Sequence, residues 1–142
     1  MDTGVQQEIK MRKICLIVVA LFIINVLPVY SQTVVGRQQY RCDWYTVDGV
    51  NEAYSLRTVY LVQYSNNTFT VEFHYNNSSI DYWDLRNQRS LAGGGNVYDA
   101  ALRGSNGYYS SGFTVRAISN LDGSVHLYFM NGSTTLMTAQ LK

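Results

Sequence analysis

Proline is nearly absent from this chain, and the only one, Pro28, lies close to the N-terminus. Because proline cannot donate a ladder hydrogen bond, the proline-free remainder suits continuous strands better than extended linkers. Lysine is scarce as well: after residue 31 only Lys142 remains, and eight basic residues there balance eight acidic ones. A segment without net charge has no bulk attraction for nucleic acid or an anionic membrane, and we expect neither as a partner.

Cysteine is almost as rare, with only Cys15 and Cys42 in the whole sequence. Cys15 falls within the apolar run described next, so Cys42 stands alone in the rest of the chain. Two interpretations of Cys42 remain open. It is either a buried thiol acting as a small hydrophobic side chain, or half of an intermolecular disulfide in an oxidising compartment.

The sequence also lacks an apolar run long enough to cross a bilayer. Residues 14–26 are apolar except for Asn25, well short of the roughly 20 residues that a spanning helix needs. Two basic residues precede this run, and Pro28 and small residues follow it, as in a secretory signal peptide. We predict a signal peptide over residues 1–31, with Met11 as a candidate true start. A retained membrane anchor is the alternative.

If the leader is removed, residues 32–142 form one domain of ordinary size. Apolar and polar residues alternate in Phe69–Tyr75, 113–117 and 125–129, which is typical of strands with one face in a core. Asp48-Gly49, Asp122-Gly123 and Asn131-Gly132 are dipeptides that favour tight hairpins. We predict an all-β domain: a single small antiparallel barrel or sandwich of about seven or eight strands.

The stretch from residue 89 to residue 109 is the hardest to interpret. Residues 97–102 fit a short helix or a strand about equally well. Gly93-Gly94-Gly95 lacks the spacing of a phosphate-binding loop. It is therefore expected to be a flexible connection, with a flap over a ligand as the alternative.

No catalytic or metal-binding constellation is recognisable. His74 and His126 are the only histidines, and both are expected to face solvent, whereas a zinc site needs three or four ligands. Glu72, Asp81 and Asp84 could supply a carboxylate pair, but nothing in their spacing favours one. We therefore predict no catalytic residues, no metal, no cofactor and no enzymatic activity.

Aromatic residues are plentiful instead. Adjacent strand residues point to opposite faces, so one member of each pair, Tyr82-Trp83 and Tyr108-Tyr109, should leave the core. Tyr128 and Met130 share a face with His126. Exposed tyrosine and tryptophan bind sugars and anchor interfaces. The candidate binding residues are Tyr82, Trp83, Tyr108, Tyr109, His126 and Tyr128.

Three functions remain open from these residues. The first is an exported, non-enzymatic binding module that presents aromatic side chains to a glycan, a small ligand or a protein. The second is a structural or homo-oligomeric protein of the cell envelope, and the third is a small periplasmic enzyme inhibitor. The expected location is the periplasm, the cell surface or the medium.

The third function is considered because two short segments resemble parts of known proteins. The segments QYRCDWY and TVEFHYNN, followed by a stretch rich in serine and glycine, resemble parts of small periplasmic lysozyme-inhibitor barrels. The resemblance covers a few residues, and beyond the predicted signal peptide the sequence has no second cysteine to pair with Cys42. It assigns no family.

Overall fold

The computed structural model describes residues 32–142 of this chain, and the predicted signal peptide lies outside the described residues. Within them there are ten strands and one short 3-10 helix. The strands are β1 (Val34–Tyr40), β2 (Cys42–Val47), β3 (Val50–Asn51), β4 (Leu56–Tyr64), β5 (Phe69–Tyr75), β6 (Ile80–Ser90), β7 (Asn96–Gly104), β8 (Tyr109–Ser119), β9 (Val125–Asn131) and β10 (Thr134–Leu141), and the 3-10 helix is η1 (Ala53–Ser55).

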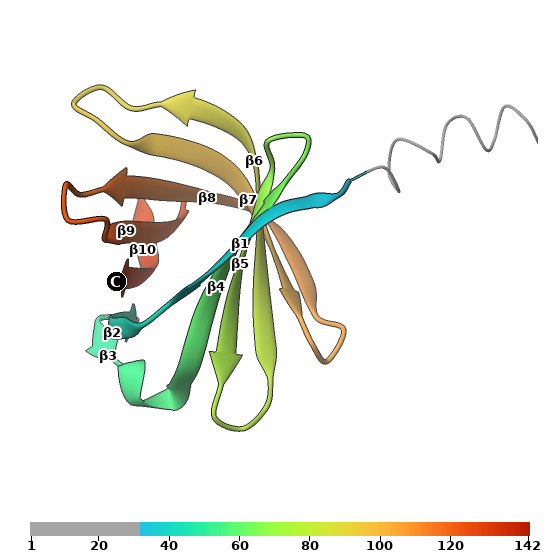
Figure 1. Ribbon diagram of the computed structural model, residues 1–142. Helices are drawn as coiled ribbons and strands as arrows, with labels where there is room; N and C mark the ends of the chain where they lie inside the picture. The colour runs from blue at the N-terminus through green and yellow to red at the C-terminus, as the bar shows by residue number, and fades with distance from the viewer. Residues whose placement is uncertain (1–31) are drawn as a thin grey trace, which may run out of the picture. The chain divides into compact units, whose positions relative to one another are not determined.

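All ten strands belong to one antiparallel sheet, in the order β1-β4-β5-β6-β7-β8-β9-β10-β2-β3 (Figure 1). The prediction of an antiparallel all-β domain is confirmed. The predicted seven or eight strands are too few, because the chain forms two strands, β1 and β2, on either side of Arg41 and also the two-residue strand β3. The uncertain residues 97–102 lie within strand β7.

The hydrogen-bond ladder of this sheet is not closed, because β1 and β3 are its two edges. The two ends of the sheet are nevertheless connected, because β1 is followed directly in the chain by β2. β1 pairs with β4, and β2, which begins one residue after β1 ends, pairs with β10. At the junction, Arg41 and Lys142 exchange two backbone hydrogen bonds of 3.0 and 2.9 Å. The sheet therefore curls around a single core.

Five hairpin turns repeat one pair of backbone hydrogen bonds, at residues 64–68, 75–79, 91–95, 104–108 and 120–124. In each turn the fourth residue has a positive φ, as three-residue hairpin loops require. The three glycines after Ala92 belong to the turn between β6 and β7. Gly95 approaches β8 so closely that a Cβ there would lie 2.7 Å from the carbonyl oxygen of Ala117. The base of this turn, where β7 begins, thus lies directly against β8.

The core lies on the inner side of the curled sheet, where the alternation of each strand predicts it. Trp83, Phe73 and Phe129 are its largest fully buried side chains, with Val59, Val71 and Val115 between them. Tyr45 and Phe73 pack with ring centroids 5.3 Å apart, and Trp83 and Phe129 with centroids 4.7 Å apart. These aromatic contacts join β2 with β5 and β6 with β9, which are not neighbours in the sheet, so distant parts of the curled sheet pack against each other in the core.

In residues 32–142, no helix has the length and apolar character needed to span a membrane.

Candidate functional site

Trp83 is not available as a surface binding residue. Its side chain is only 2% exposed and packs on the inner side of the sheet against Phe113 and Phe129. The alternation rule holds at this pair, because Tyr82 points outward when Trp83 points inward. The rule fails at the second pair, where Tyr108 and Tyr109 are both more than half exposed at the turn between β7 and β8. Trp83 is therefore removed from the candidate binding residues.

Tyr82 and Tyr109 lie on the outer side of β6 and β8, with Arg103 of β7 between them. Arg103 is directly opposite both tyrosines in the strand register. Its guanidinium carbon lies 4.8 Å from the centre of the Tyr82 ring, and Asp84 accepts hydrogen bonds from two of its nitrogens. Because the guanidinium of Arg103 is already paired with Asp84, Arg103 is poorly suited to bind a charged ligand.

A second paired group lies further along the same outer surface, on β1, β4 and β5. Arg37 lies 3.8 Å above the centre of the Tyr60 ring and bonds Glu72 at 3.2 Å. The same carboxylate oxygen of Glu72 lies 2.8 Å from Nε2 of His74. We call the outer side chains of this region, Arg37, Tyr60, Glu72, His74, Tyr82, Asp84 and Arg103, the paired face.

His74 was expected to face solvent, and this expectation is wrong. Only 9% of the residue is exposed, although it points to the outer side of β5. Tyr60 packs edge-on against its ring at 5.0 Å, and Glu72 bonds its Nε2. Alternation predicts which side of a strand a residue faces, but it does not predict whether large neighbours cover that side.

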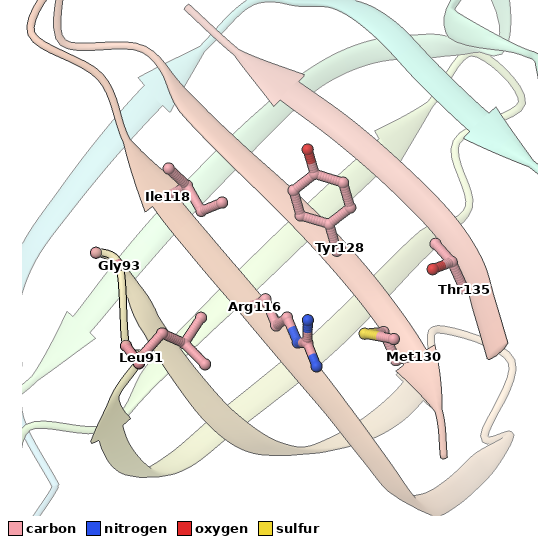
Figure 2. A pocket seen from close by; sticks show the side chains of 9 residues that line it. Leu91, Gly93, Arg116, Ile118, Tyr128, Met130 and Thr135 are labelled. Atoms are coloured by element: carbon pink, nitrogen blue, oxygen red, sulfur yellow. The ribbon is translucent and has the colours of Figure 1, made fainter. Parts of the chain in front are cut away.

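The other part of the outer surface, on β8, β9 and β10, contains a shallow hollow of about 360 Å³. Figure 2 shows Arg116 between Leu91 of the hairpin tip and Met130, with Tyr128 and Ile118 above them. Register places Arg116 directly opposite Tyr128. Met130 is 8% exposed and forms the floor of the hollow. We call Leu91, Arg116, Ile118, Tyr128 and Met130 the open face.

Arg116 is an exposed arginine that makes no ion pair or side-chain hydrogen bond with any residue from 32 to 142. The sequence analysis did not select it. Its position in the alternating segment 113–117 does predict an outward side chain, and this signal could have placed it beside Tyr128. The hairpin between β6 and β7 also lines the hollow with Gly93 and Gly94. If this segment covers a ligand, as the alternative prediction for the three glycines has it, the hollow is where that ligand would bind.

Of the predicted binding residues, the structure brings together Tyr128 and His126, whose rings lie 6.1 Å apart. His126 is directly opposite both Ile118 of β8 and Gln140 of β10. Tyr108 and Tyr109 lie near the other end of β8, at a strand distance on the order of 20 Å from Arg116. The predicted residues thus form two separate groups, and only one of them adjoins a hollow.

Trp44 was not predicted as a binding residue, yet half of it is exposed. It lies on β2 directly opposite Gln140, which in turn is opposite His126. Directly paired residues share one face of an antiparallel sheet. Trp44 therefore extends the same outer surface beyond the open face, and its indole is a natural fluorescent reporter for that surface.

The carboxylates considered for catalysis are all engaged by other side chains. Glu72 and Asp84 lie on the outer side and are engaged by arginines, whereas Asp81 lies on the inner side and accepts a 2.9 Å hydrogen bond from Tyr75. Tyr75 also bonds the hydroxyl of Tyr45 at 2.9 Å. Burial raises the pKa of Tyr45 to about 12 and that of Tyr75 well above its usual range, so both stay neutral.

Across residues 32–142, no group of three or more His, Cys, Asp or Glu side chains gathers to hold a metal ion. Cys42 packs against the core from β2, and its thiol donates to the carbonyl oxygen of Trp44 at 3.2 Å. Burial raises the pKa of this thiol to about 11. Little thiolate therefore exists at neutral pH to form the predicted intermolecular disulfide, since the thiolate is the reacting species.

A scan against protein-family models, a search of curated proteins and a search of solved structures each found no match to this chain.

Proposed function

We propose that this chain is an exported, non-enzymatic binding module and that the open face on β8, β9 and β10 is its binding site. The observation that carries the proposal is the combination at Arg116. An arginine without an ion pair or side-chain hydrogen bond in the described part of the chain lies in a hollow beside an accessible tyrosine and several apolar side chains. A volume of about 360 Å³ lies at the small end of the range for ligand sites.

The scaffold supports this use of the outer surface. The inner side of the sheet is filled by aromatic and branched side chains, with Phe73, Phe129 and Val115 fully buried. Of the open face only Met130 is buried, so its other side chains are not needed for the core. We also propose that the sheet forms a small barrel, in which Arg41 connects β1 to β2 and so joins the two ends of the sheet. This connection would hold β8, β9 and β10 in a fixed position.

Export remains part of the proposal because of the basic, apolar and small-residue order of residues 12–31. Periplasm, cell surface and medium are all consistent with it. A protein that works in an oxidising compartment with a single Cys42 must keep that thiol unreactive, and the burial of its side chain provides a means.

A homo-oligomer is the second candidate, and one observation favours it. Val34 and Val35 are 57% and 60% exposed on β1, whose outer edge has no strand partner within residues 32–142. Exposed apolar edge strands invite pairing with another chain. Size-exclusion chromatography with light scattering separates the two functions, since a binding module of the first kind is expected to be monomeric.

Protein-observed NMR with a library of small polar and apolar fragments tests the proposed site. We expect binders to shift amide signals of residues 91–94, 116, 118, 128, 130 and 135, with a change in Trp44 fluorescence for the larger ones. Binders that shift only the paired face, or a library that shifts nothing in the open face, would contradict the proposal.

A further inference from the structure

Two segments of this chain have the same pattern of an outward tyrosine, an inward aromatic residue and a third outward residue. They are Tyr82-Trp83-Asp84 on β6 and Tyr128-Phe129-Met130 on β9. The inward members touch each other in the core, with ring centroids 4.7 Å apart. The two segments differ in the third residue, which is an acid on β6 and a thioether on β9.

The neighbouring strand places an arginine at the same register position in both cases. On β7, Arg103 is directly opposite Tyr82, and Ala101 is opposite Asp84. On β8, Arg116 is directly opposite Tyr128, and Thr114 is opposite Met130. A half-turn about an axis perpendicular to the sheet would therefore superimpose one pattern on the other. By register, Met130 occupies the place that Asp84 has beside its arginine.

The two arginines have different partners. Both carboxylate oxygens of Asp84 accept hydrogen bonds from Arg103, in a fork of two parallel bonds. A guanidinium presents this fork in a fixed plane that matches a carboxylate. Arg116 presents the same fork without an ion pair among residues 32–142, because the acid diagonal to it on β7, Asp99, is bonded by Arg89 and Asn87 instead. On its other side, towards β9, Arg116 borders the hollow.

We propose that the ligand of the open face is a small organic carboxylate with a flat apolar body, and that its carboxylate takes the place that Asp84 holds in the paired face. This inference rests on the proposed function. The acid group pairs with Arg116, and the apolar body packs against Tyr128, Ile118 and Leu91. The shared chemistry is the carboxylate, which aromatic acids, aliphatic acids and sugar acids all carry.

The walls of the hollow favour an apolar acid over a sugar acid. Leu91, Ala92, Ile118 and Met130 provide apolar surface, while Thr135 is the only neutral side-chain hydroxyl besides that of Tyr128 in the lining. A sugar ring carries several hydroxyl groups, and each loses its water on binding unless it finds a new partner. We therefore expect an aromatic acid to bind more tightly than a sugar acid.

The test uses three probes followed by NMR on the purified protein: phenylacetate, its neutral amide phenylacetamide, and glucuronate. We expect phenylacetate to shift the amides of the open face and to bind about ten-fold more tightly than phenylacetamide, as one charge-assisted fork would provide. The preference should shrink as salt is raised, because Arg116 is exposed. Tighter binding of glucuronate than of phenylacetate would overturn the apolar part of the inference.

Two variants test the assignment of the partner. Arg116→Gln should remove the preference for phenylacetate over its amide, and Met130→Asp should abolish phenylacetate binding by supplying the missing acid within the chain. Arg57→Gln is the matched control, since Arg57 is another exposed arginine without an ion pair in the described chain, and it should change nothing.

The outcomes separate this inference from the function it rests on. If phenylacetamide binds at the open face as tightly as phenylacetate, and Arg116→Gln changes neither, the site is real and the carboxylate is wrong. If no probe binds, the carboxylate inference is wrong, and the fragment library decides the proposed function independently. Should Met130→Asp fail to fold, the Arg116→Gln result alone decides.

Discussion

The paired face and the open face are built from the same residue types on one sheet, yet they have opposite characters. In the paired face every arginine over a tyrosine also has a carboxylate: Arg37 has Glu72, and Arg103 has Asp84. In the open face Arg116 is opposite a tyrosine and has no carboxylate partner among residues 32–142, since the nearby Asp99 is paired with Arg89. The two faces therefore differ in whether the acid next to the arginine is available to pair with it.

The two faces also differ in how much their charged side chains contribute to the free energy of unfolding. Paired charges on the outside of a sheet usually contribute little, because solvent screens them. The part of the paired face around Glu72 is an exception, since the Glu72 and His74 side chains are only 14% and 11% exposed. The paired face should therefore contribute to the free energy of unfolding through its charged side chains, whereas Arg116 of the open face should contribute almost nothing.

The largest expected effect comes from breaking the paired face at its most buried point. Glu72→Ala leaves the largely buried Nε2 of His74 without its acceptor and also removes the partner of Arg37. We expect a loss of about 3 kcal/mol in the free energy of unfolding, measured by urea denaturation. Glu52→Ala is the control, since no side-chain hydrogen bond of Glu52 is present, and a similar loss there would contradict the assignment.

A hydrogen-bonded set inside the sheet provides a reference that is independent of both faces. Because the pKa values of Tyr45 and Tyr75 are raised, the folded state keeps both protons when the unfolded chain has begun to lose them, near pH 10. Their contribution is therefore complete below pH 10 and is lost as the pH rises towards 12, by about 2 kcal/mol for each tyrosine.

Urea titrations at pH 9 to 12 measure this slope. Tyr45→Phe should make the decline shallower, whereas Tyr108→Phe, at an exposed tyrosine, should leave it unchanged. An equal decline in both variants would place the origin of the alkaline instability outside the core.

Removing the acid from the paired face is the converse of adding an acid to the open face by Met130→Asp. Asp84→Met copies Met130 at the equivalent position, so Arg103 loses its carboxylate while Tyr82 stays in place. We expect a cost of about 1 kcal/mol, because the pair is partly exposed. We also expect new phenylacetate-dependent shifts in the amides of β6 and β7. If these shifts do not appear, an unpaired arginine beside a tyrosine is not sufficient to make a site.

Much of this fold follows from the sequence, and the reasons are local. Alternation predicts the inward side chains of β5 and β9, such as Phe73 and Phe129, and the Asp-Gly and Asn-Gly pairs predict hairpins that the structure contains. These features depend on backbone periodicity and on positive φ angles, both of which act within a few residues.

What could not be predicted depends on register between strands. β-bulges at Leu56–Thr58 of β4 and at Ala100–Ala101 of the β7–β8 pairing shift which side chains share a face. Only the pairing shows that Arg103 is opposite Tyr82 and that Arg116 is opposite Tyr128. The sequence alone therefore selected tyrosines as candidates but missed the arginine that distinguishes one of them.

The smallest expected effect is the change in the free energy of unfolding when the arginine of the open face is removed. Arg116 packs beside the hollow without an ion pair, so Arg116→Ala should change the free energy of unfolding by less than about 0.5 kcal/mol. Arg37→Ala is the matched substitution in the paired face, and it should cost more because it exposes Tyr60 and leaves Glu72 with one partner fewer. Thermal and urea unfolding of both variants measure the difference. If Arg116→Ala destabilises as much as Arg37→Ala, Arg116 is held by the fold after all, and the two faces do not divide stability from binding.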